Sequence, residues 1–288
     1  MKAALRSLLA ERIDYAGLFP PAALSMTDAV ANFAAYRESA DAWALARFVL
    51  PVVRLEEFEA VAAPHLRGAP WRLSVLAQLT DADAIRAFNG RMAGRAHIDT
   101  VESRAATVED VAALAPLASL GTTYVELSLG EDPASLIAAV AAHGLRAKMR
   151  TGGVTAESFP SAREVARFLV ACVQHRVMLK ATAGLHHPLR GEYALTYDAH
   201  AARATMFGFV NVFLGASFAR QGMDAAILET LLEERDPAAF HVDDDHVKWR
   251  AHTLAAAALA NDRDRFAVSF GSCSFREPLD DLSALSFP

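Results

Sequence analysis

Short runs of β-branched and other apolar residues alternate along the chain with Ala-rich segments whose apolar positions repeat with a helical period. This alternation predicts βα units arranged around a parallel sheet. Strand, loop and helix recur about every 25 to 30 residues, a length typical of βα units. Eight strands are predicted, over residues 14–18, 47–52, 72–78, 97–103, 123–129, 146–150, 177–182 and 266–270.

Several of the predicted helices begin at recognisable N-terminal signals. Ser, Thr and Asp side chains accept hydrogen bonds from the free N–H groups of a first turn, and Pro fits the first helical position. The helices therefore have defined starting points between the strands. The signals are Thr27-Asp28, Asp81, Thr107 to Asp110, Asp132-Pro133 and Ser161.

Eight such repeats favour closure into a (β/α)8 barrel, an α/β fold whose functional pocket lies at the C-terminal ends of the strands. A doubly wound open sheet is the alternative, but residues 16–25 after the first strand contain no Gly-rich dinucleotide-binding fingerprint. We expect residues 1–288 to form one barrel domain, since this fold commonly reaches that length.

The stretch between the seventh and eighth strands is longer than a βα unit requires. Its pattern predicts helices over residues 200–220, 225–235 and 251–260, with an irregular segment at 240–250. We interpret residues 193–264 as an elaborated loop and helix of the barrel, not as a second domain.

Composition narrows the class of partner. Hydrophobic residues make up 53% of the chain and charged residues 22%, which is enough apolar material for a large core. The net charge is −6 and Lys and Arg form no block, so neither nucleic acid nor an anionic membrane is an expected partner. A small molecule is the predicted partner, and the aromatic segment 207–218 offers a surface for a homo-oligomer.

The sequence also favours a cytoplasmic location. Its longest apolar stretches are far shorter than the roughly 20 residues that a membrane-spanning helix needs, and residues 1–10 read as an amphipathic helix, not a signal peptide. The two cysteines, Cys172 and Cys273, provide neither a disulfide framework nor metal-ligand spacing. Cys273 is interpreted as a small buried residue, and a nucleophile beside His186 or His187 is the alternative, which no sequence signature supports.

Two lysines are the main candidates for chemistry. Alternation along the sixth strand places Lys148 and Arg150 on one face, and Lys180 interrupts an otherwise apolar seventh strand. Burying the charge of a lysine costs folding free energy, so a buried lysine is expected to be paired or catalytic. Burial and a neighbouring cation would lower the pKa of such a lysine and make its amine available to attack a carbonyl. The alternative interpretation is a structural ion pair with a carboxylate.

These strands resemble the paired motifs of the deoxyribose-phosphate aldolase branch of class I aldolases. The matching segments are Lys148-Met-Arg-Thr151-Gly152 and Lys180-Ala-Thr-Ala-Gly184. The resemblance implies that Lys148 forms a Schiff base and that Lys180 lowers the pKa of Lys148. Thr151, Gly152 and Gly184 of these motifs are candidates for the substrate site.

The segment Gly271-Ser272 at the end of the last strand is similar to the phosphate-binding loop of such barrels, where backbone N–H groups hold an anion. The chain also departs from the family, because its third strand contains no proton-relay aspartate. Glu102 and Glu126, on the fourth and fifth strands, are the candidates for acid–base work, with ion pairing to the lysines as the alternative.

A histidine pair, His186-His187, follows the seventh strand, where it suits proton transfer or hydrogen bonding to a substrate. Asp14 on the first strand begins a segment that continues into the stiff loop Gly17 to Pro21 at the same mouth, and is a further candidate for substrate binding.

Three hypotheses follow. The first is a lyase or aldolase that acts on a small anionic oxo-compound through a lysine Schiff base, with Arg150 holding the anion and no cofactor or metal. The second is a metal-assisted lyase or hydrolase with Glu102, Glu126 and a histidine as ligands and Lys180 as general base. The third is a non-catalytic barrel that binds an anionic metabolite, which lysines saturated by salt bridges would favour.

Overall fold

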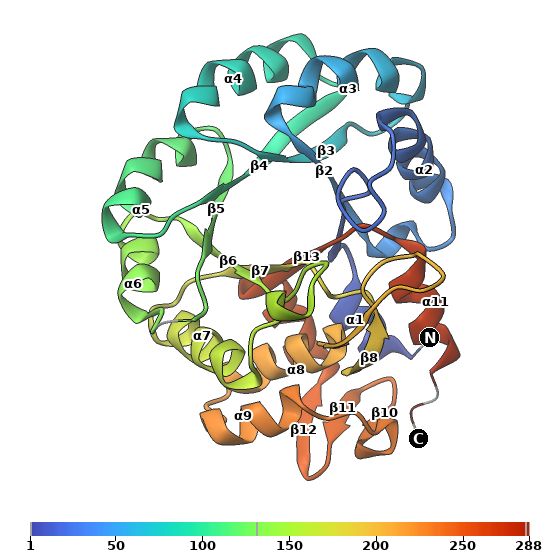
Figure 1. Cartoon of the computed structure of the whole chain (residues 1–288), viewed down its shortest axis with the longest axis vertical. Coiled ribbons are helices and arrows are strands. Elements are labelled where there is room, and N and C mark those ends of the chain that lie inside the picture. The colour runs from blue at the N-terminus through green and yellow to red at the C-terminus, as the bar shows by residue number, and fades with distance from the viewer. Residues whose placement is uncertain (1, 131, 286, 288) are drawn as a thin grey trace.

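A closed barrel of eight parallel strands forms the centre of the computed structural model, which describes residues 2–130, 132–285 and 287. Figure 1 looks into the ring of strands, with the helices outside it. This confirms the predicted α/β fold and rules out the open sheet. Around the barrel the strands are β1 (Ile13–Tyr15), β13 (Ala267–Ser272), β7 (Leu179–Thr182), β6 (Arg146–Arg150), β5 (Thr122–Leu127), β4 (Ala96–Arg104), β3 (Trp71–Leu76) and β2 (Leu45–Pro51).

Helices surround the strands, and the apolar core is one continuous cluster that includes residues of both. None of the helices described is long and apolar enough to cross a membrane. The helices are α1 (Ala3–Leu9), α2 (Met26–Glu38), α3 (Leu55–Ala62), α4 (Ala82–Arg91), α5 (Val108–Leu114), α6 (Ala134–Ala142), α7 (Ala162–Gln174), α8 (Phe209–Arg220), α9 (Ala225–Leu232), α10 (Ala256–Arg265) and α11 (Arg276–Ala284).

The predicted N-terminal signals act as expected at α5 and α7. Thr107 and Ser161 each accept a hydrogen bond from the backbone three residues on, and complete a capping box with the acidic residue there. Helix α2 differs from the prediction by two residues, because Ser25 is its N-cap and accepts a hydrogen bond from the Asp28 N–H.

The elaborated region lies between β7 and β13. It contains an antiparallel hairpin of β8 (Gly191–Ala194) and β9 (Arg203–Met206), helices α8 and α9, a sheet of β10 (Phe240–Val242), β11 (His246–Trp249) and β12 (His252–Ala255), and helix α10. Two predicted helices were wrong at their beginnings. Residues 203–206 pair with β8 and residues 252–255 pair with β11, so α8 and α10 begin only at Phe209 and Ala256.

Unusually for such a barrel, buried charges and hydroxyls occupy its interior beside the usual branched apolar side chains. They come from six of the eight strands, so polar groups distant in sequence meet at the barrel axis. These residues are Asp14, Ser74, Thr100, Glu102, Lys148, Lys180 and Ser269, all less than 5% exposed.

Candidate functional site

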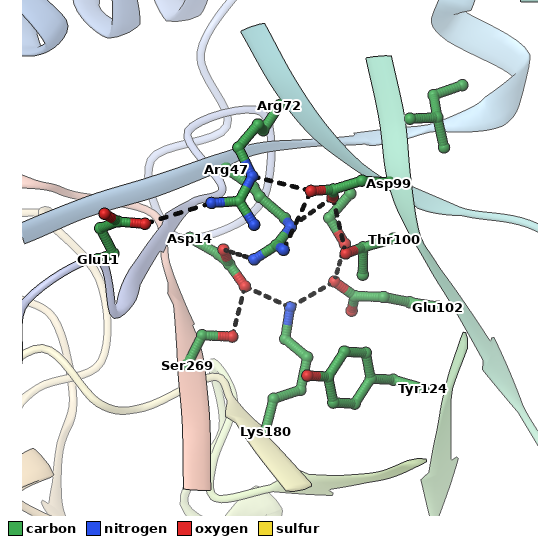
Figure 2. A network of polar contacts seen from close by, with 12 residues as sticks. Glu11, Asp14, Arg47, Arg72, Asp99, Thr100, Glu102, Tyr124, Lys180 and Ser269 are labelled. Carbon is green, nitrogen blue, oxygen red and sulfur yellow. Dashed lines mark hydrogen bonds and ion pairs between the residues drawn. The ribbon is translucent and has the colours of Figure 1, made fainter. Parts of the chain in front are cut away.

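Lys180 lies in the centre of the barrel, between two carboxylates. Its Nζ donates hydrogen bonds of 2.6 Å to Asp14 Oδ2 and of 2.6 Å to Glu102 Oε1 (Figure 2). Ser269 donates to the same oxygen of Asp14, and Ser74 donates to the same oxygen of Glu102. The ammonium is therefore held by two carboxylates that are themselves hydrogen-bonded.

The expected lowering of the Lys180 pKa is wrong. Burial, the largest single influence, would lower the pKa, but Asp14 and Glu102 together outweigh it and raise the pKa well above its ordinary value. Because β6 and β7 pair with Lys148 opposite Lys180, the second cation is present, as the sequence predicted. Nevertheless, the two carboxylates determine the direction in which the pKa of Lys180 shifts.

Lys148 occupies the equivalent position on the neighbouring strand. Its Nζ lies 2.8 Å from Glu102 Oε2 and 2.8 Å from Glu126 Oε2. Glu102 thus bridges the two lysines, one with each oxygen. Burial would raise the pKa of Glu102, but Lys148 and Lys180 together hold it far below its usual range.

Two arginines at the mouth contact the other oxygen of Glu126. Arg150 Nε lies 3.0 Å and Arg104 Nε 3.2 Å from Glu126 Oε1. Burial would raise the pKa of Glu126, and the cationic neighbours, Lys148 first, lower it. Arg150 is partly exposed, with 40% of its side chain accessible, so its guanidinium remains within reach of a ligand.

The ion pairs continue from Asp14 toward the opposite end of the barrel, as Figure 2 shows. Arg47 lies 3.9 Å from Asp14 and 2.6 Å from Asp99. Arg72 contacts the same Asp99 at 2.8 Å and also contacts Glu11 at 3.3 Å. Positive and negative side chains alternate along the whole series, which we call the charge chain. Its members are Glu11, Arg72, Asp99, Arg47, Asp14, Lys180, Glu102, Lys148, Glu126 and Arg150.

A cavity of about 260 Å³ opens above the two lysines. The loop after β1, expected at the mouth, supplies Phe19, Pro20 and Pro21 to its wall, and the elaborated region supplies Leu195, Tyr197 and Met206. Eight of the candidate residues line this cavity, namely Glu102, Lys148, Arg150, Lys180, Gly184, His186, His187 and Gly271.

The remaining candidates lie behind the cavity wall. Asp14 and Glu126 act through the lysines that they contact. Thr151 is fully buried and donates to the Ala183 carbonyl, so it holds the loop after β7. Gly152 packs on Phe159, where a Cβ would lie 2.4 Å from the ring.

The expected anion-binding loop at Gly271-Ser272 is instead part of strand β13. Gly271 pairs with Asp14 of β1 and Thr182 of β7, and Ser272 pairs with Tyr15 of β1. Its backbone therefore belongs to the barrel ladder. Ser272 is also buried and does not line the cavity.

The two adjacent histidines each bind a carboxylate of α11. His186 Nδ1 lies 3.0 Å from Glu277 Oε2, and His187 Nδ1 lies 2.6 Å from Asp281 Oδ2. The metal-ligand set considered from the sequence is therefore not brought together, because its carboxylates contact lysines and its histidines contact α11. Among the residues described, no group of three or more His, Cys, Asp or Glu side chains is placed to hold a metal ion.

A further cluster lines the cavity, which we call the thiol cluster: Cys273, His186, Glu277 and Tyr197. The sequence suggested the pairing of Cys273 with a histidine only as the less favoured alternative, and it gave no sign of Glu277 or Tyr197. Cys273 is buried, as expected, but its Sγ lies 3.9 Å from His186 Nε2 and 3.6 Å from Tyr197 Oη. Tyr197 Oη also donates to Glu277 at 3.0 Å. Glu277 and Asp281 are one helical turn apart, and this spacing indicates that they share a helix face. It does not indicate which residues that face contacts.

No protein family matches the sequence, and no curated protein matches it. Among solved structures, the lysine/ornithine decarboxylase complexed with cadaverine from Vibrio vulnificus is similar at 11% identity and a TM-score of 0.37, over 62% of this chain. The matched part is 48% of that enzyme, so the chain spans about half its length. This degree of similarity bears on neither the site nor the reaction.

Proposed function

We propose that the protein is an aldolase-like lyase that binds a small oxo-compound as a Schiff base on Lys148. The observation that carries the proposal is the position of Lys148: on the cavity wall, at the C-terminal mouth of the barrel, beside a second lysine and between two carboxylates. Catalytic residues of such barrels occupy strand ends at this face. The motif resemblance assigns the same lysine.

Lys148 suits the role of nucleophile better than Lys180. Lys180 is only 1% exposed, and its ammonium donates aligned hydrogen bonds to both of its carboxylates. Lys148 contacts its carboxylates as close ion pairs, and Glu126 Oε2 accepts no aligned hydrogen bond from any residue described. An amine held less rigidly can turn toward a carbonyl carbon in the cavity.

The carboxylates favour the product of that attack. Lys148 loses a proton, its nitrogen adds to the carbonyl carbon, and the oxygen leaves as water, so the iminium carries the same positive charge as the original ammonium. Glu102 and Glu126 then stabilise the iminium as they stabilise the lysine. His186, which also lines the cavity, and Glu126 are the groups placed to move protons.

Arg150 supports an anionic substrate. Its exposed guanidinium uses one edge for Glu126 and leaves donors that suit a carboxylate or phosphate.

A second candidate function is a non-catalytic barrel that binds an anionic metabolite. The observation in its favour is that both lysines are engaged by carboxylates in the structure as it stands. In that case the ion pairs serve the fold, and the cavity selects a ligand without covalent chemistry.

Borohydride trapping separates the two. Intact mass spectrometry follows the protein after borohydride treatment with a panel of small aldehydes and 2-oxo acids. We expect a single reduced adduct in the wild type that is lost in Lys148→Arg, which retains the charge between Glu102 and Glu126 but cannot form a Schiff base. The adduct should persist in Lys248→Ala, which removes an exposed lysine of β11 and controls for surface labelling.

Loss of the adduct in Lys180→Met but not in Lys148→Arg would reassign the nucleophile. No adduct with any compound would overturn the lyase proposal and favour the metabolite-binding barrel. Circular dichroism of each variant verifies that the fold is retained.

A further inference from the structure

The thiol cluster has the arrangement of a nucleophile, a base and a group that orients the base. Cys273 follows directly after β13, His186 lies in the loop after β7, and Glu277 lies in the first turn of α11. Glu277 Oε2 contacts His186 Nδ1 at 3.0 Å, and Nε2, the other ring nitrogen, lies 3.9 Å from the sulfur. All three residues line the cavity.

We propose that Cys273, His186 and Glu277 form a second nucleophilic centre in the cavity, which accepts a short acyl group from an ester or thioester. Geometry supports this assignment. Such a set is recognised by a thiol within reach of an imidazole whose other nitrogen bonds a third group. Cys273 Sγ lies almost equally far from the two ring nitrogens, 3.9 and 4.0 Å, so a small rotation of the imidazole aims Nε2 at the sulfur.

The local electrostatics agree with this geometry. Burial would lower the pKa of His186, but Cys273 and Glu277 raise it to about 10. Burial would raise the pKa of the Cys273 thiol, but His186 and Tyr197 lower it. Each group therefore favours the charged form of the other, and the thiolate is the reactive form of cysteine.

The groups that face Cys273 come from four elements. They are His186 after β7, Tyr197 in the β8–β9 hairpin, Tyr15 of β1, and the Ala22 backbone N–H in the loop after β1. Glu277 of α11 acts through His186 and Tyr197. Among these, His186 is the group whose cationic form lowers the pKa of the Cys273 thiol most.

The reaction uses water as its second substrate. The Cys273 thiolate forms an S–C bond to the acyl carbon, the leaving alkoxide or thiolate takes the proton of His186, and a thioester remains on Cys273. Neutral His186 then takes a proton from water, whose oxygen attacks the thioester. The carboxylic acid is released, and the thiolate and imidazolium are restored.

The cavity determines the size and character of the acyl group. Its volume of about 260 Å³ admits a small molecule, and Phe19, Pro20, Leu195 and Met206 give it an apolar side. A short acyl chain can pack against these apolar residues, and Lys148 and Arg150 line the same cavity.

The test uses p-nitrophenyl acetate as the probe and maps the acetyl group by peptide mass spectrometry. We expect acetylation of Cys273 at pH 7, with a rate that falls about a hundredfold in His186→Gln, the usual contribution of a general acid–base group. Glu277→Gln should cause a smaller loss. Alkylation by iodoacetamide across pH 5–9 should show an inflection for Cys273 that moves to higher pH in His186→Gln.

Cys172 is a matched control within the same chain. It is fully buried in α7, and burial raises the pKa of its thiol, so it should react only when the protein unfolds. A variant in which Cys172 remains unreactive is folded.

The proposal is overturned if folded protein carries acetyl groups on lysines but not on Cys273, or if His186→Gln does not change the rate. Lys248→Ala, which removes an exposed lysine of β11 outside the cavity, should leave acetylation of Cys273 unchanged. Borohydride trapping reports on a lysine and acetylation on Cys273, so the two results stand or fall separately.

Discussion

Lys180 is a fully buried cation, and its contribution to the stability of the fold depends on its two carboxylates. Moving a charge out of water costs several kcal/mol, and a buried pair recovers this only with close, hydrogen-bonded partners. Both contacts of Lys180 are 2.6 Å long, and both carboxylates accept a further bond from a serine. Removing the lysine would leave Asp14 and Glu102 as like charges in a buried site.

Lys180→Met should therefore lower the free energy of unfolding by about 3 kcal/mol at pH 7, as expected when one partner of a buried ion pair is removed. The loss should shrink near pH 4, where the freed carboxylates take up protons. Urea unfolding at both pH values measures this effect.

Arg150→Met is the matched control, because its partly exposed ion pair should contribute less than about 1 kcal/mol. Equal effects of the two substitutions, or a Lys180→Met effect independent of pH, would contradict the prediction.

The sequence identifies the two buried lysines better than it identifies the residues that contact them. Lys148 and Lys180 stand out because a charge inside an apolar strand needs a reason, and pairing with Glu102 and Glu126 was one of two interpretations. That Glu102 joins both lysines depends on strand register and on the direction of its two oxygens. Cys273 was interpreted as a small buried residue because no sequence signature supports a Cys/His pair. Glu277 and Tyr197 come from elements whose placement local pattern does not determine.

At the scale of elements, the start of α8 holds the histidine loop in place. The Phe209 and Val210 N–H groups donate to the carbonyls of His187 and Pro188 at 3.0 Å. Gly208 makes this approach possible, because a Cβ there would lie 2.3 Å from the Pro188 oxygen and from Leu189 Cα. The free N–H groups of a helix start are thus satisfied by the loop that carries the site.

Gly208→Ala should force the helix and the loop apart. We expect a loss of about 1–3 kcal/mol in the free energy of unfolding, typical of overpacking, and slower alkylation of Cys273 as His186 moves. Chemical unfolding and iodoacetamide kinetics measure the two effects.

Gly215→Ala provides the comparison within the same helix. A Cβ there meets Leu232 and Leu169 at 3.6–3.7 Å, an ordinary contact, and Ala gains up to about 1 kcal/mol over Gly in a helix. If both substitutions behave alike, the close approach at Gly208 has no energetic role.

The same region shows how far sequence pattern predicts elements. All eight barrel strands were predicted within a few residues, because buried parallel strands are short apolar runs separated by helices. The helix expected from residue 200 was wrong before Phe209, since pairing with β8 overrides the helical preference of Ala and Arg at 202–204. Pairing of this kind depends on a partner strand, which local periodicity does not reveal.

Across the whole molecule, the charge chain links the two ends of the barrel. Its carboxylates Asp99, Glu102 and Glu126 all have a lowered pKa, because the cations on either side outweigh the opposing effect of burial. A carboxyl group with a lower pKa in the folded state binds fewer protons there than in the unfolded chain. It therefore contributes stability above its unfolded pKa, about 4, and loses it as the pH falls through the folded value.

The free energy of unfolding should consequently fall below about pH 4, with the unfolded state taking up protons. Urea titrations between pH 7 and pH 2.5 measure this slope. Glu102→Gln removes one of these carboxyls, so its stability should depend less steeply on pH in the acid range. An identical slope in wild type and variant would show that the chain does not control acid stability.

The alternation of the charge chain also bears on how this sequence can diverge. Every inner member touches two neighbours of opposite sign, so one substitution removes one of the two partners of each neighbour. Mutations can change residues of the outer helices one at a time. The members of the charge chain, in contrast, must be conserved or replaced together. A distant relative would therefore be recognised by this spaced set of acids and bases after overall identity has faded.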